Sequence, residues 1–245
     1  MKKVVVFFLL TIVFAGTTTA QEAEALWRFG ISAKPSISWL GTNLQEFEND
    51  GARLNFGYGL MVERSIFSST VIAGGIFVND FRGTFNYVEK DQHVKFHEQN
   101  DSIRFETRKM SLKYVEVPFK LKFRTPEINY ITYTAHFGIN MGFRVKAMAD
   151  DHFRDIRADG TTGVYDNRDI RDDIGFIKMA LDVGVGGEYN LAGTTSLLVG
   201  LSYLNGFTNI TRKESEMLRY LGGDNAKMKQ VFYGHTLMLS VGVLF

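Results

Sequence analysis

The chain has 245 residues, no cysteine, and 28 Lys and Arg against 27 Asp and Glu. Its nearly neutral charge gives no reason to expect a nucleic-acid partner, and without cysteine it forms neither disulfides nor an N-terminal lipid thioether. No apolar run reaches the ~20 residues that a membrane-spanning helix needs, which excludes a helical membrane protein.

The first 20 residues have the order of a secretory signal peptide. Lys2 and Lys3 precede the apolar run 4–14, and small or hydroxylated residues follow up to Ala20. An uncleaved anchor is the alternative, although the run is short for a membrane span. We therefore expect a signal peptide over 1–20, cleaved near Ala20, and a single domain over 21–245.

The first predicted strand, 27–39, places apolar side chains at odd positions and mostly polar ones at even positions. A period of two residues is typical of a strand, because successive side chains point to opposite faces. The alternation returns, in chain order, at 52–62, 69–79, 114–124, 131–146, 175–189, 197–203 and 231–245. In the glycine-rich segment 69–79 apolar residues fall on both faces, so its outward side stays open.

The segments between these strands alternate in length. The connections 64–68, 125–129 and 190–195 are short, whereas 40–51, 80–111, 149–174 and 206–229 are long and polar. Short periplasmic turns and long extracellular loops are typical of outer-membrane barrels. The sequence thus predicts an all-β fold, an eight-stranded antiparallel up-and-down transmembrane β-barrel over 21–245 in the cell outer membrane. A soluble lipocalin-like barrel is the alternative.

In such a barrel the apolar faces meet lipid and the polar faces meet in the lumen. Trp27 and Trp39 then lie in the two aromatic girdles. Eight strands leave an interior just wide enough for side chains, so buried charges of opposite sign should pair. We expect a lumen ion-pair network, with a solute pore as the alternative. Its predicted members are Arg28, Lys34, Glu63, Glu116, Lys120, Lys122, Arg144, Lys178, Asp182 and Glu188.

The ending "LMLSVGVLF", with Val241, Val243 and Phe245 on one face, resembles the C-terminal strand that barrel-assembly machinery recognises. With "YVEVPFKLKF" (114–123), "HFGINMGFRVKA" (136–147) and "GLSYLNGFTNI" (200–210), it resembles the PorT-like outer-membrane barrel family of the Bacteroidota. Its most specific piece is the Glu-x-Pro at 116–118, since proline inside a strand is normally penalised. The resemblance implies an eight-stranded barrel without a cofactor, and its best known member serves a protein-secretion machine.

Two loop clusters offer metal chemistry as an alternative to solvated surface. His93 and His97, beside Glu98, have a ligand spacing but no third spaced ligand, and we expect surface histidines on a hairpin that prolongs the third and fourth strands. That hairpin would present an edge to a partner strand.

In 149–174 we expect a solvated loop whose arginines meet lipopolysaccharide phosphates, with calcium as the alternative. The loop holds Asp150, Asp151, Asp155, Asp159, Asp166, Asp169, Asp172, Asp173, Arg154, Arg157, Arg168 and Arg171.

Catalysis is not expected from the histidines. His235 and Ser240 fall on opposite faces of the last strand, and His136 has no serine nucleophile identifiable from the sequence. We therefore expect a non-enzymatic scaffold without cofactor or metal. Its expected partners are outer-membrane lipid, the barrel-assembly machinery and another envelope protein. The alternatives are an accessory subunit of a secretion machine and a narrow passive pore.

Overall fold

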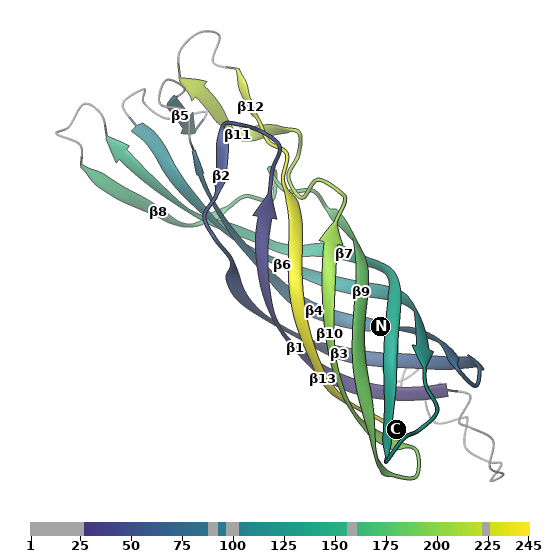
Figure 1. The fold of residues 1–245 in the computed structure, drawn as a ribbon. Coiled ribbons are helices and arrows are strands. Elements are labelled where there is room, and N and C mark those ends of the chain that lie inside the picture. The colour runs from purple at the N-terminus through teal and green to yellow at the C-terminus, as the bar shows by residue number, and fades with distance from the viewer. Residues whose placement is uncertain (1–26, 88–92, 97–102, 156–160, 222–225) are drawn as a thin grey trace, which may run out of the picture.

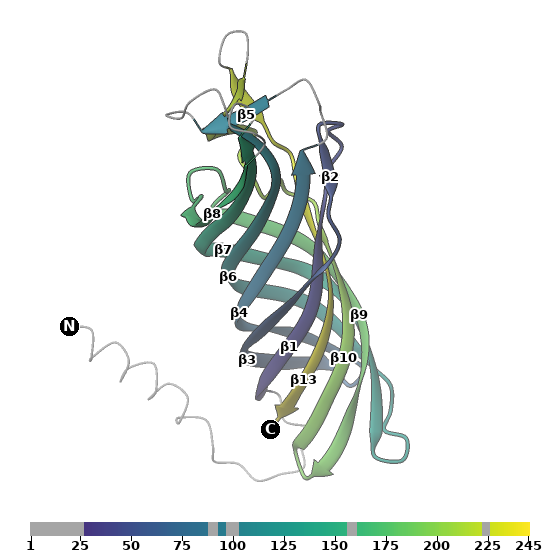
Figure 2. The ribbon, with the colours of Figure 1, turned by 90° about the vertical axis from the view of Figure 1, so that its left-hand side faces the viewer.

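The computed structural model describes residues 27–87, 93–96, 103–155, 161–221 and 226–245, so the predicted signal peptide and its cleavage site lie outside the described residues. The long strands form one closed antiparallel ring, in which each pairs with two neighbours (Figures 1 and 2). They are β1 (Trp27–Gly41), β3 (Arg53–Phe67), β4 (Thr70–Tyr87), β6 (Ile103–Arg124), β7 (Ile131–Asp155), β9 (Ile177–Ala192), β10 (Thr195–Gly206) and β13 (Tyr233–Leu244). The predicted eight-stranded barrel is confirmed.

The ring closes where the first strand meets the last. β1 pairs with β3 on one side and with β13 on the other, from Gly30 opposite Leu244 to Gly41 opposite Tyr233. Two further main-chain hydrogen bonds of 2.9 and 2.8 Å join Phe29 and Phe245 reciprocally. The C-terminal segment is therefore a structural part of the ring. In the described residues no helix is long and apolar enough to cross a membrane.

The two ends of the barrel differ, as the alternation of connection lengths predicted. Residues 68–69, 125–130 and 193–194 make short turns at one end, called here the turn end. The opposite, loop end carries the short strands β2 (Phe47–Asn49), β5 (His93–Phe96), β8 (Thr162–Asp169), β11 (Glu214–Leu221) and β12 (Lys227–Lys229) (Figure 1). The long connections are thus partly folded into strands.

The outward face of the barrel wall is apolar and the inward face polar. Leu54, Leu60 and Ile31 point outward, and Leu54 is 74% exposed. Ser32, Asn55 and Glu63 on the same strands are buried. For β4, where the sequence left the orientation open, Val71, Phe77 and Phe81 are buried, and Ile72 and Ile76 alternate with them toward the outside. This inverted arrangement is the one that suits lipid.

The polarity of the wall reverses at Tyr114. Below it, toward the turn end, β6 buries Glu116 and Lys122; above it, the buried side chains are Leu112 and Met110. In β7 a β-bulge accompanies the reversal, because Lys113 pairs with Lys146 but Tyr114 pairs with Arg144. Val145 is the extra residue, and it shifts the parity so that Ala147 and Ala149 turn inward. The upper part of the wall is therefore built like a soluble protein.

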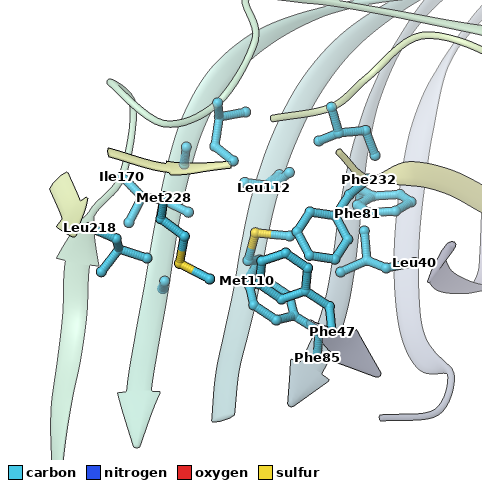
Figure 3. Packing of buried hydrophobic residues seen from close by; sticks show 14 of the residues in the cluster. Leu40, Phe47, Phe81, Phe85, Met110, Leu112, Ile170, Leu218, Met228 and Phe232 are labelled. Carbon is cyan, nitrogen blue, oxygen red and sulfur yellow. The ribbon is translucent and has the colours of Figure 1, made fainter. Parts of the chain in front are cut away.

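Sixteen apolar residues form a buried core at the loop end, called here the loop-end cluster (Figure 3). Its centre is a group of aromatic rings, with Phe85 4.4 Å from Phe232 and Phe47 4.9 Å from Phe232 between centroids. All four long connections contribute to it. The members are Leu40, Phe47, Phe81, Phe85, Phe105, Met110, Leu112, Tyr114, Ala147, Ala149, Ile170, Ile174, Ile210, Leu218, Met228 and Phe232.

The structure confirms one prediction about the long connections and corrects another. β4 and β6 do continue as a hairpin, paired as far as Asn86 opposite Thr107. The solvated loop expected over 149–174 is wrong in its conformation, because β7 runs on to Asp155 and pairs with β8, although Arg154, Asp169 and Arg171 are exposed. Asp151 and Asp173, two of its acidic residues, are fully buried.

Phe85→Ala should loosen the loop end without opening the barrel. Replacing a fully buried Phe by Ala costs about 3–5 kcal/mol because a cavity remains. We expect faster proteolysis of the long connections, while the barrel keeps its heat-modifiable migration in gels. The control Phe56→Ala removes an outward ring and leaves no internal cavity. Equal protease sensitivity of the two variants would contradict a cooperative loop-end core.

Candidate functional site

At the turn end of the lumen, side chains from four strands form a closed ring of alternating charge, called here the turn-end ring. Arg28 donates to Glu63 Oε2 at 2.5 Å and to Glu188 Oε2 at 2.7 Å. Lys122 lies between the same two carboxylates, in contact with Glu63 and 2.5 Å from Glu188 Oε1. Two cations and two carboxylates thus neutralise one another across the barrel, which is what makes their burial tolerable.

A second group lies deeper in the lumen, around Asp182. Lys120 Nζ is 2.7 Å from Asp182 Oδ2, and His136 Nε2 is 3.1 Å from Asp182 Oδ1. The same His136 nitrogen is 3.3 Å from both Lys120 Nζ and Ser202 Oγ. One imidazole therefore joins β6, β7, β9 and β10 across the lumen.

A third group closes the polar part of the lumen beneath the loop-end cluster. Glu116 accepts hydrogen bonds from Lys178 at 2.7 Å, Asn79 at 2.5 Å and Asn140 at 2.8 Å. The Lys178 ammonium also lies 4.6 Å from the centre of the Tyr114 ring. Glu116 is the second residue before Pro118 in β6, and Pro118 faces Asn140 across the ladder to β7.

The ten predicted lumen residues fall into three groups according to the contacts of their side chains. Arg28, Glu63, Glu116, Lys120, Lys122, Lys178, Asp182 and Glu188 take part in ion pairs. Lys34 is buried with its ammonium 3.0 Å from the centre of the Phe77 ring. Arg144 lies outside the groups above, at the level of the bulge, and donates to the main-chain oxygen of Arg171 at 2.7 Å.

Sequence reasoning left out the neutral partners in the lumen. Asn140 and Ser202 occupy the inward parity of their strands, which is the signal that would have identified them. Asn79 lies on β4, whose orientation the sequence left open. A prediction of the lumen network should therefore include neutral polar side chains at inward positions as well as charged ones.

The His136 environment corrects one expectation and argues against catalysis there. A serine does face this histidine, because Ser202 Oγ is 3.3 Å away. However, Ser202 and Asp182 both contact Nε2. A Ser-His-Asp triad instead uses the two ring nitrogens, one for the nucleophile and one for the carboxylate. This geometry does not form a proton relay.

Trp27 and Trp39, the predicted girdle residues, lie on the outward face at opposite ends of the wall. Trp39 stacks on His235 at 5.7 Å and on Tyr203 at 6.2 Å, and the Tyr203 hydroxyl is 3.1 Å from His235 Nδ1. At the turn end, the Arg64 guanidinium lies 5.1 Å from the Trp27 ring. Val241, Val243 and Phe245, the predicted assembly signal, follow the outward parity of the last strand. His235 therefore belongs to an aromatic stack, and Ser240 points the other way.

Above the lumen, one buried guanidinium ties the loop-end connections together. Arg108 Nε and Nη2 donate to Asp151 at 2.5 and 2.9 Å, and Nη1 lies 3.5 Å from Asp173 Oδ2. Burial alone would lower the pKa of Arg108, but the acidic groups around it, Asp151, Tyr87 and Asp173, together outweigh burial and raise that pKa. Asp173 also accepts from Ser215 Oγ and from the Glu216 amide, both at 2.8 Å. The contact thus joins β6, β7 and β11.

Several of the residues considered for metal binding pair with other side chains or lie outside the described residues. His97 and Glu98 lie outside the described residues, as do Arg157 and Asp159. Asp169 pairs with Arg171 at 2.7 Å, which lowers the pKa of its carboxyl group, and Arg154 pairs with Glu106 at 3.0 Å. In the described parts of the chain, no three histidines or carboxylates converge on a metal position.

Comparison with known proteins gives a family match and distant structural likenesses. The model of the family described as "Outer membrane protein beta-barrel domain" matches residues 19–212. No curated protein matches the chain. OprG from Pseudomonas aeruginosa is 9% identical, with a TM-score of 0.47 over 93% of this chain and 99% of that one. Ail from Yersinia pestis is 14% identical, with a TM-score of 0.34 over 89% and 97% of the two chains.

Glu63→Gln should destabilise the barrel by leaving Arg28 and Lys122 to share Glu188. Removing one partner of a buried ion pair typically costs about 3–5 kcal/mol. The double variant Glu63→Gln/Lys122→Met removes one charge of each sign and keeps the Arg28–Glu188 pair. We expect urea unfolding in lipid vesicles to show most of the stability restored in the double variant. If it unfolds as easily as the single variant, the ring is not held by charge balance.

Proposed function

The chain belongs to the outer membrane protein beta-barrel domain family, and on that premise we propose that it is a non-enzymatic scaffold that presents its loop end to another envelope protein. The observation that carries the proposal is the loop-end cluster. Loops that only cover a barrel mouth have no need of a core that buries residues from every long connection. A core of this kind holds a surface in one shape, as recognition of a protein partner requires.

The loop end, which is extracellular in barrels of this kind, also has a strand edge for such a partner. Among the described residues, β8 pairs only with β7. Its other side is an edge of the sheet, and a sheet edge is where a partner strand can be added. Val164 on this strand is 42% exposed, so the edge also offers an apolar contact.

The absence of enzymatic activity is part of the proposal. The serine nearest to a lumen histidine shares one imidazole nitrogen with Asp182, and His235 lies beside the rings of Trp39 and Tyr203 on the outward face. Neither arrangement activates a nucleophile. Outer-membrane lipid, the second proposed partner, meets the apolar outward band between Trp27 and Trp39.

The finer alternative is an accessory subunit of a protein-secretion machine, as the resemblance to the PorT-like family implies. The strands that carry the resemblance form the barrel wall, and a secretion role would add a periplasmic contact at the turn end. Glu116 and Pro118, its most specific residues, face the lumen. The resemblance therefore supports the scaffold more directly than it supports a particular machine.

Extraction in mild detergent, with a tag after the signal cleavage site, tests the proposal. We expect one stoichiometric envelope protein to be recovered with the wild type. Val164→Lys on the β8 edge should reduce that recovery at least tenfold. Thr194→Lys, in a turn at the opposite end, should leave it unchanged. A loss only with Thr194→Lys would favour the secretion-machine alternative, and a barrel that elutes alone would contradict the scaffold.

The alternative of a narrow passive pore makes the opposite prediction for conductance. The three groups of lumen side chains and the loop-end cluster lie in series along the barrel axis. We expect no steady single-channel steps from the wild type in planar bilayers at moderate voltage. Phe85→Ala should stay silent too, because the turn-end ring still fills the lumen. Regular steps from the wild type would support the pore.

A further inference from the structure

In the described part of the chain, one stretch of the lumen holds one more cation than carboxylates. Between the turn-end ring and Tyr114, the cations are Arg28, Lys34, Lys120, Lys122 and Lys178, and the carboxylates are Glu63, Glu116, Asp182 and Glu188. Each carboxylate already contacts a cation other than Lys34. Lys34 has no carboxylate within ion-pair distance in the described chain, although it is only 6% exposed. An ammonium buried without a counter-charge is strongly unfavourable.

One side of the Lys34 ammonium is occupied by the Phe77 ring, 3.0 Å from its centre. A ring face attracts a cation, but it does not cancel the charge. Lys34 also lines a cavity of about 70 Å³ in the lumen, beside Glu63 and Lys122 of the turn-end ring. That volume exceeds what a single water molecule requires, about 10–15 Å³ on the same measure.

The cavity wall is partly apolar, and its polar part carries hydrogen-bond donors. Besides Lys34 and Lys120, the hydroxyl residues Thr134, Ser202 and Ser240 line it. Glu63 is the carboxylate of the lining, and Arg28 and Lys122 already hold it. Asp182, close by, is held by Lys120 and His136. The cavity thus combines an ammonium without an acidic partner with several hydroxyl groups that can donate.

We propose that this cavity binds a small monovalent anion, of which chloride is the chemical type, between the Lys34 ammonium and the hydroxyl groups of Thr134, Ser202 and Ser240. A single negative charge balances the single excess cation. A divalent oxyanion would reverse the imbalance and would need more donors than the wall provides. The anion is therefore a structural ligand that completes the charge balance of the lumen.

The turn-end ring lies on the path from the turn end to the anion site, and this affects how an anion can be brought into the site in an experiment. A second cavity, of about 450 Å³, lies at the turn end and is lined by Arg28 and Glu188 of that ring. The ring lies between this outer cavity and the inner one. We expect bound anion to exchange slowly with solvent, so the test uses protein refolded in a chosen anion.

The first measurement is anomalous diffraction from the whole protein refolded and crystallised in sodium bromide. We expect a bromide peak in the inner cavity, within contact distance of Lys34 Nζ. Lys34→Met should lack that peak, and Lys34→Arg, which retains the charge, should keep it. A wild-type map without a peak would overturn the proposal, and would favour a neutral Lys34 amine with water beside it.

The second measurement is thermal stability after refolding in chloride or in the bulky anion gluconate, at equal ionic strength. The wild type should melt at a higher temperature in chloride, by an amount that saturates with concentration. Lys34→Met should melt at the same temperature in both salts. The surface variant Lys113→Met, which removes an exposed charge, should keep the wild-type difference. If Lys34→Met folds, as heat-modifiable migration would show, and retains the chloride effect, the site is wrong.

Discussion

Closure of the sheet is the constraint on which the rest of this molecule depends. In a lipid bilayer no water is present to satisfy an open strand edge, so β1 and β13 must pair and the ring must be complete. A ring of eight strands leaves a narrow interior. Inward side chains then meet at hydrogen-bond distance from opposite walls, as Arg28 does with Glu188. The polar inner face of the sheet therefore becomes a network that bridges the barrel.

The same strands serve two media, and the change between them is sharp. Below Tyr114 the outside is apolar and the inside charged, whereas above it the inside is apolar. In β6 the same alternate positions face inward throughout, and the residue types at these positions change from polar to apolar. In β7 the extra residue Val145 changes which alternate positions face inward. Above the change, a soluble-type core with a buried Arg108–Asp151 pair stands on a lipid-facing wall. The two parts share strands but are held by different interactions.

The sequence predicts what local periodicity determines. Alternation predicts the outward faces of β1, β3, β6 and β9, and connection length predicts which end carries the loops. The inward face of β4 is not predictable in the same way, because Phe77 and Ile76 are both apolar and only the ring decides between them. The burial of Asp151 depends on Arg108, 43 positions earlier in the chain. The contact of Ser202 with His136 likewise depends on the register of three strands. Contacts between residues so far apart in the sequence leave no recognisable pattern in a short stretch of it.

The shared core at the loop end has a consequence for how the exposed surface can diverge. Phe47, Ile174 and Phe232 come from three different connections, and their side chains belong to one cluster. A change of size in one connection therefore alters the support of the others. Surface variation under selection by antibodies or phage would have to be concerted among the connections. Exchange of a single connection between related barrels would transfer its sequence without its shape.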